Sequence, residues 1–191
     1  MFTIKSVKAM TFAFSFAAIA VVVLAMALPA SAHGSTRGDF DRVRSATGKY
    51  FDLDLAKGDG YALLKDAAGI ACIDSPGVGA MGVHYANGEL IGSGVIDPLK
   101  PQVLVYAPGP NGRLSLAAVE YVVFQEAWDA ANPQPPVLFG EQFMLTPAGN
   151  RFGLPAYYAL HVWIWEKNSR GVFSMWNPRV HCRASAEGDY N

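Results

Sequence analysis

The sequence predicts an α+β domain built mainly on an antiparallel sheet or a partial barrel, with one helix near its N-terminus. The first observation is that apolar residues before Gly60 recur at helical spacing. The second is that apolar residues after Gly60 recur every second position, in short segments. The third is that turn sequences such as Ser75-Pro76-Gly77 separate these segments, as is typical of strands joined by hairpins.

The predicted helix begins at Asp39, whose side chain can cap the first turn. Gly48 weakens this helix, and Gly58 with Gly60 ends it. The residues that form its apolar stripe are Phe40, Val43, Thr47, Tyr50 and Leu53.

Alternation and turn signals divide the rest of the chain into short strands. Strands are predicted at 61–64, 70–73, 80–85, 103–107, 114–124, 157–165, 172–176 and 180–182. Asn87-Gly88 indicates a tight hairpin turn, and 126–131 a short helix. The stretch 132–155 is rich in proline and glycine, so we expect it to wrap around the domain with 142–145 as an edge piece.

The N-terminus has the pattern of a cleaved secretory signal peptide. Lys5 and Lys8 precede an apolar run that ends in Ala30-Ser31-Ala32. The sequence therefore predicts a signal peptide at 1–32, a leader at 33–38, a single domain at 39–183 and a solvated tail at 184–191. An uncleaved membrane anchor is the alternative, because about 18 apolar residues can barely span a bilayer.

Composition restricts the class of protein and its partners. Hydrophobic residues make up 51% of the chain and charged residues 16%, which excludes a disordered chain. The formal net charge of -1 gives no basic face, so no nucleic-acid partner is expected. Contact with a membrane is expected only through the signal segment before its cleavage, and the protein is predicted to be secreted or extracytoplasmic.

The chain has two cysteines, Cys72 and Cys182. In an exported protein a single pair most simply forms a disulfide. The alternative is a pair of thiolate metal ligands, which the wide spacing and the lack of a Cys-x-x-Cys sequence disfavour.

Five strings carry a resemblance to a known group: 79–85 (GAMGVHY), 118–124 (AVEYVVF), 150–155 (NRFGLP), 160–165 (LHVWIW) and 176–182 (WNPRVHC). They resemble secreted bacterial proteins of unassigned function, over about residues 40–182. The resemblance implies export and a single domain, and it implies no activity, cofactor or catalytic residue.

Three ionisable residues, His84, Glu120 and His161, lie in the middle of predicted strands. Alternation places each on the face away from the most aliphatic row of its strand. The expected core rows are Met81, Val83 and Tyr85; Val119, Tyr121 and Val123; and Leu160, Val162 and Ile164.

Two imidazoles and one carboxylate suit one divalent metal ion such as Zn, Fe or Cu. The alternative is that the three side chains hydrogen-bond to one another or face solvent, as one face of an antiparallel sheet often does. Alternation fixes the face on which a side chain lies but not which strands are neighbours.

These observations leave three functions open. The first is a secreted domain that binds a small-molecule ligand or partner in a pocket walled by Tyr85, Tyr121, Trp163 and Trp165. The second is a metal-dependent enzyme that uses the two histidines and the glutamate as ligands. The third is a structural protein of the cell envelope.

Overall fold

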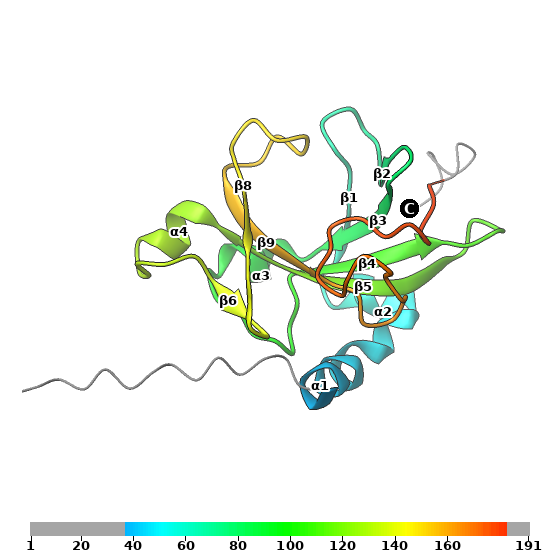
Figure 1. Ribbon diagram of the computed structural model, residues 1–191, viewed down its shortest axis with the longest axis horizontal. Helices are drawn as coiled ribbons and strands as arrows, with labels where there is room; N and C mark the ends of the chain where they lie inside the picture. Colours follow the sequence, from blue (N-terminus) through cyan, green and yellow to red (C-terminus); the bar gives the residue numbers. More distant parts are fainter. Residues whose placement is uncertain (1–36, 183–191) are drawn as a thin grey trace, which may run out of the picture. The chain divides into compact units, whose positions relative to one another are not determined.

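A computed structural model describes residues 37–182, all within one compact unit (Figure 1). The predicted signal peptide at 1–32 and the tail at 184–191 lie outside the described residues. Among residues 37–182, no helix is both long and apolar enough to cross a membrane.

Three short helical segments stand where the sequence predicts one helix. They are α1 (Arg37–Thr47), the 3-10 helix η1 (Gly48–Phe51) and α2 (Leu53–Gly58). The break falls at Gly48, and Asp52 starts α2 by accepting a hydrogen bond from the Asp54 backbone. The predicted leader is also too long, because the last two of its residues already belong to α1.

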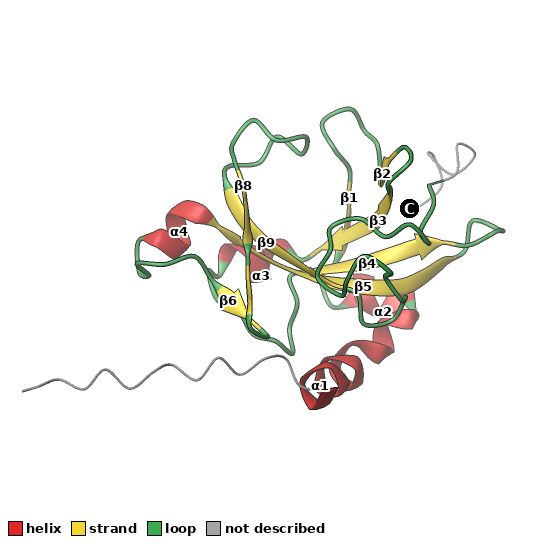
Figure 2. Ribbon diagram, viewed as in Figure 1, coloured by secondary structure: helices red, strands yellow, loops and turns green. Residues whose placement is uncertain are grey.

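The core of the domain is a seven-stranded antiparallel sheet. Its strands are β1 (Ala62–Leu64), β2 (Cys72–Ser75), β3 (Gly79–Ala86), β4 (Val103–Pro108), β5 (Leu114–Phe124), β8 (Met144–Thr146) and β9 (Tyr157–Val162). They follow the order β1-β3-β4-β5-β9-β8, and β2 also pairs with β3. Strands β6 (Val137–Leu138) and β7 (Glu141–Gln142) form a separate pair. The α+β class is therefore confirmed, and the sheet does not close into a barrel (Figure 2).

One predicted turn is wrong, and one predicted short helix is found close to its expected place. Asn87-Gly88 is not a tight turn, because the Asn87 side chain accepts from the Leu90 backbone and caps helix α3 (Gly88–Gly92). The connection from β3 to β4 therefore runs over residues 87–102. The second short helix, α4 (Gln125–Asp129), lies within a residue or two of its predicted place.

The chain leaves the sheet earlier than predicted. β9 ends at Val162, and 172–176 and 180–182 are irregular segments instead of strands. The backbone N–H groups of Trp165 and Glu166 both donate to the carbonyl of Ala117, where the pairing of β4 with β5 is interrupted. These bonds direct residues 163–182, the C-terminal segment, away from the sheet edge and across one face of the sheet.

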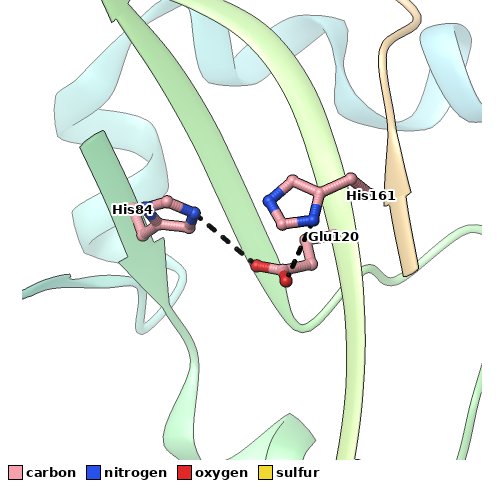
Figure 3. A group of neighbouring side chains, drawn as sticks. All are labelled: His84, Glu120 and His161. Atoms are coloured by element: carbon pink, nitrogen blue, oxygen red, sulfur yellow. Dashed lines mark ion pairs between the residues drawn. The ribbon is translucent and has the colours of Figure 1, made fainter. Parts of the chain in front are cut away.

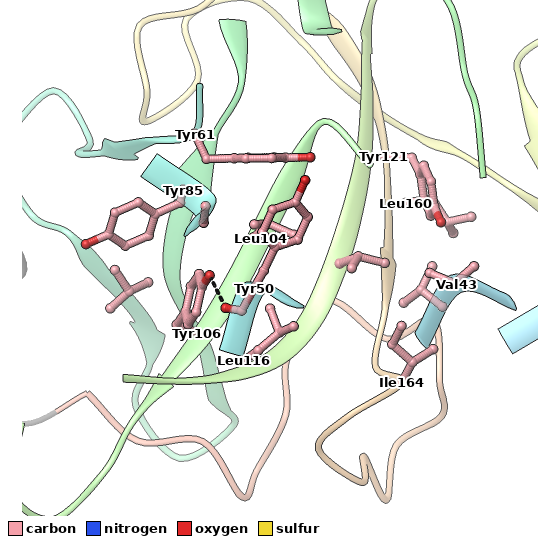
Figure 4. Close-up of a cluster of buried hydrophobic side chains, with 14 of the residues drawn as sticks. Val43, Tyr50, Tyr61, Tyr85, Leu104, Tyr106, Leu116, Tyr121, Leu160 and Ile164 are labelled. Carbon is pink, nitrogen blue, oxygen red and sulfur yellow. Dashed lines mark hydrogen bonds between the residues drawn. The ribbon is translucent and has the colours of Figure 1, made fainter. Parts of the chain in front are cut away.

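Each face of the sheet carries its own core. The larger core packs the tyrosine and aliphatic rows of β3, β4, β5 and β9 against α1, η1 and α2 (Figure 4). Within it, the Tyr106 hydroxyl donates to the Tyr50 carbonyl at 2.7 Å. The smaller core lies on the other face, where Val103, Val105 and Ala118 pack against Trp163 and the C-terminal segment.

The disulfide holds this C-terminal segment in place. Cys72 and Cys182 are bonded, as predicted, with their Cα atoms 5.6 Å apart. The bond joins β2 to an irregular segment, not to a last strand. Asn177 and Ala80 add a two-way backbone pairing nearby. Gly79 permits it, because a Cβ at this position would lie 2.4 Å from the Asn177 carbonyl oxygen.

Candidate metal centre

Strand register brings His84, Glu120 and His161 together on the face of the smaller core. Glu120 on β5 lies directly opposite His161 on β9. His84 is on β3, one strand further away, and reaches across β4. The β4 residues opposite Glu120 and His84 are Val103 and Val105, whose short side chains leave that path open.

The three side chains point toward one another (Figure 3). Nδ1 of His161 lies 3.3 Å from one carboxylate oxygen of Glu120, and Nε2 of His84 lies 3.8 Å from the other. The imidazole rings are perpendicular, with centroids 5.8 Å apart. One nitrogen or oxygen from each residue lies within 4.8 Å of those from the other two.

All three residues are buried, and their polar atoms are poorly satisfied. His84 is 2%, His161 5% and Glu120 7% exposed. By strict hydrogen-bond geometry, no described residue is a partner of either ring nitrogen of His84 or of Nε2 of His161, although the Gly82 backbone interacts with His84. Buried polar atoms without partners are rare, because each costs about 1–3 kcal/mol. Nε2 of His84, which faces the Glu120 carboxylate, is the one of these atoms that a group bound within the cluster would satisfy.

Burial shifts the pKa of each residue toward its neutral form. It raises the pKa of Glu120 to about 8. It lowers the pKa of His84 to about 4, with the backbone of Gly82 acting in the opposite direction. It lowers the pKa of His161 to about 3, and the nearby His84 adds to this effect. The imidazoles are therefore neutral near pH 7, which is the form that binds metal ions.

Aromatic rings cover the two histidines. Trp163 stacks on His161 with ring centroids 6.3 Å apart and planes 17° apart, and its Nε1 donates to the Ser174 carbonyl at 2.6 Å. The Phe152 ring lies edge-on to His84, with a centroid distance of 6.2 Å. These contacts limit the rotation of both imidazoles.

A cavity of about 80 Å³ adjoins the cluster, and Glu120 and His161 form part of its wall. This volume holds a few water molecules, at about 30 Å³ for each. It is far below the roughly 300–1,000 Å³ of sites for small organic ligands. The cavity therefore suits an ion with its water ligands.

Three of the four residues predicted to wall a ligand pocket lie elsewhere. Tyr85 and Tyr121 are fully buried in the larger core, on the opposite face of the sheet. Trp165 packs against Phe51 at the end of η1, with ring centroids 4.8 Å apart. Of the four, only Trp163 contacts the cluster. Alternation along a strand places Tyr85 and Tyr121 on the opposite face of the sheet from the cluster, because each directly follows a member of the cluster in the sequence.

One residue of the cavity wall, Met81, lies where the sequence did not predict it. Met81 was expected in the larger core, beside Val83 and Tyr85. The structure corrects this, because β2 pairs Ile73 with Gly82 and Asp74 with Ala80, which leaves Met81 as an extra residue in β3. Met81 lies on the cavity wall instead. The flanking Gly82 was the available signal, since its φ of 97° breaks the regular alternation.

The donor set and its spacing fit a tetrahedral metal ion. Bonds of about 2.0–2.1 Å place tetrahedral ligand atoms about 3.4 Å apart. The two histidine–glutamate distances, 3.3 and 3.8 Å, are measured to different oxygens of Glu120, and one donor atom from each residue lies within 4.8 Å of the other two. A small inward shift of the side chains would bring the three donor atoms to the tetrahedral spacing. A set of three protein ligands leaves at least one coordination position of the metal open.

Comparison with protein-family models, with curated protein sequences and with solved structures gave no match for this chain.

Proposed function

We propose that this protein is an extracytoplasmic metal-binding protein whose ligands are His84, Glu120 and His161. One observation carries the proposal: two buried imidazoles converge on the buried carboxylate of Glu120, through Nε2 of His84 at 3.8 Å and Nδ1 of His161 at 3.3 Å, and Nε2 of His84 has no hydrogen-bond partner among the described residues. A bound divalent cation would satisfy Nε2 of His84 and favour the ionised form of Glu120.

The small size of the adjoining cavity favours a metal ion over an organic ligand at this site. An organic ligand or substrate of ordinary size does not fit into about 80 Å³. Water or another very small molecule does fit, so the remaining coordination positions are open to it. A purely structural role leaves the buried Nε2 of His84 without a partner among the described residues.

Two features support a location outside the cytoplasm. The disulfide between Cys72 and Cys182 is compatible with an oxidising compartment. The signal-peptide pattern predicted at 1–32 points to the same location.

Metal analysis tests the proposal. Purified protein is treated with a chelator, incubated with Zn²⁺, Cu²⁺ or Fe²⁺, desalted, and analysed by inductively coupled plasma mass spectrometry. We expect about one tightly held ion per chain for at least one of these metals. His84→Ala, His161→Ala and Glu120→Gln should each lose it.

His181→Ala is the matched control, because this histidine is exposed and lies in the C-terminal segment. It should bind metal like the wild type. Absence of stoichiometric metal from the wild-type protein with all three ions would overturn the proposal. So would undiminished binding by the three ligand variants, with circular dichroism confirming that they are folded.

A further inference from the structure

We propose that the metal of this centre is copper, and that the thioethers of Met81, Met144 and Met175 hold it as Cu(I). This inference rests on the proposed function, because the methionines line the cavity into which the predicted ligands Glu120 and His161 open. It adds a soft, sulfur-lined side to a centre otherwise made of imidazole and carboxylate.

The distribution of methionine carries the inference. The chain has six methionines, and three of them lie within residues 37–182. All three line this one cavity of about 80 Å³. They come from three separate elements, namely β3, β8 and the irregular C-terminal segment. Ordinary use of methionine as a filler of core gaps does not require them to meet in one place.

Each of the three methionine side chains is brought to the cavity by a different structural feature. Met144 lies opposite Ala159 in the pairing of β8 with β9, on the same face as His161 two residues along. The small alanine leaves room for the long methionine to reach diagonally toward His161.

Met81 is the extra residue of β3, placed on the cavity wall by the register shift next to Gly82. Met175 follows Ser174, whose carbonyl accepts the hydrogen bond of Trp163, and the Val172 carbonyl accepts from the Trp163 backbone. The ring that stacks on His161 therefore also fixes the segment that carries Met175.

Ligand chemistry selects the metal. Thioethers are soft ligands that favour Cu(I), whereas Zn²⁺ and Fe²⁺ are well served by imidazole and carboxylate alone. The two cysteines of the chain are bonded to each other, so methionine is the remaining sulfur ligand. A thioether also cannot form a disulfide, which makes it a durable soft ligand in an oxidising compartment.

Competition for Cu(I) tests the inference. Under anaerobic conditions, the protein competes with the chromophoric chelator bicinchoninate for Cu(I), and Zn²⁺ affinity is measured separately. In the triple variant Met81→Leu, Met144→Leu and Met175→Leu, we expect Cu(I) affinity to fall at least about tenfold and Zn²⁺ affinity to stay within about twofold. Leucine is chosen because this exchange nearly conserves side-chain volume.

A matched pair on the edge strand avoids any effect of core packing. Met144 and Leu145 are neighbours on β8, 52% and 45% exposed, and they point to opposite faces. Met144→Ser should weaken Cu(I) binding, and Leu145→Ser should leave it unchanged. X-ray absorption at the copper edge should show sulfur neighbours in the wild type, and fewer in Met144→Ser.

The results separate this inference from the proposed function. Wild-type Cu(I) affinity in the triple leucine variant, or a copper spectrum without sulfur, would refute the thioether site while leaving the histidine–glutamate centre intact. Loss of Cu(I) in the methionine variants but not in His84→Ala or His161→Ala would support the thioether site and refute the proposed ligand set. Failure of the wild type to bind any of the metals tested would overturn both.

Discussion

Arg151 donates a hydrogen bond of 2.8 Å to Asp66, 85 residues earlier in the chain, and so joins two loops beside the buried cluster. Asp66 also accepts from the backbones of Ala68 and Ile70, which shapes its own turn. The residue after Arg151 is Phe152, whose ring lies against His84. The ion pair therefore helps to hold one wall of the centre.

Asp66→Asn should lower the stability of the protein at neutral pH by about 1–3 kcal/mol, because it removes a charged acceptor from three hydrogen bonds. Arg151 and these backbone bonds keep the pKa of Asp66 below its ordinary value. The carboxylate therefore stabilises the fold above the pKa of the unfolded chain, about 3.9, and loses this effect as the pH falls further. Thermal unfolding at several pH values should show the gap to the wild type closing in acid. Asp74→Asn, at an exposed position, is the control, and an effect as large as that of Asp66→Asn would contradict the prediction.

Glu120→Gln should make the metal-free protein more stable than the wild type at alkaline pH. The pKa of Glu120 is raised by burial from 4.5 to about 8, so the unfolded state releases the proton more readily than the folded state does. Wild-type stability therefore decreases as the pH rises from about 4.5 through 8, and the glutamine variant lacks this contribution. Melting temperatures with a chelator present should be similar at pH 5 and higher for Glu120→Gln at pH 9. A constant difference over this range would show that Glu120 ionises as an ordinary carboxyl.

Reduction of the disulfide should destabilise the domain and loosen the C-terminal segment. The bond closes a loop with a sequence separation of 110, which corresponds to about 4–5 kcal/mol of chain entropy. Cys72→Ser with Cys182→Ser should lower the melting temperature and weaken metal binding, because this segment carries Met175 and packs over the smaller core. Mass spectrometry of alkylated, unreduced protein is the check, and labelling of both thiols would contradict the bond.

Gly82→Ala should destabilise the protein strongly. Gly82 has φ of 97°, and a Cβ there would lie 2.5 Å from the carbonyl oxygen of Tyr106. The backbone conformation alone costs about 1–3 kcal/mol for a residue with a side chain, and the clash adds to it. Gly58→Ala is the control, since a Cβ at that position meets no atom within 4 Å and its φ is ordinary. Chemical denaturation should show a loss of stability for the first variant, and none for the second.

Features that depend on neighbouring residues were predictable from the sequence. The strands at 80–85, 103–107 and 114–124 agree with β3, β4 and β5 to within one or two residues, because alternation and turn residues are local signals. Predictions failed where a long-range bond decides the local structure. Alternation predicts that the strand continues beyond Val162 to residue 165. The backbone N–H groups of Trp165 and Glu166 instead donate to the Ala117 carbonyl, and these bonds direct the chain away from the sheet.

Sequence alone determined the face of the strand on which each ionisable side chain lies, because side-chain direction along a strand repeats every two residues. It also predicted the disulfide that the structure confirms, because the chain has only two cysteines. Only the tertiary structure decided that His84, Glu120 and His161 meet, since this depends on the order β3-β4-β5-β9 and on the valines that separate them on β4. It likewise decided that three methionines from three elements share one cavity, because contacts between distant segments leave no periodic trace in the sequence.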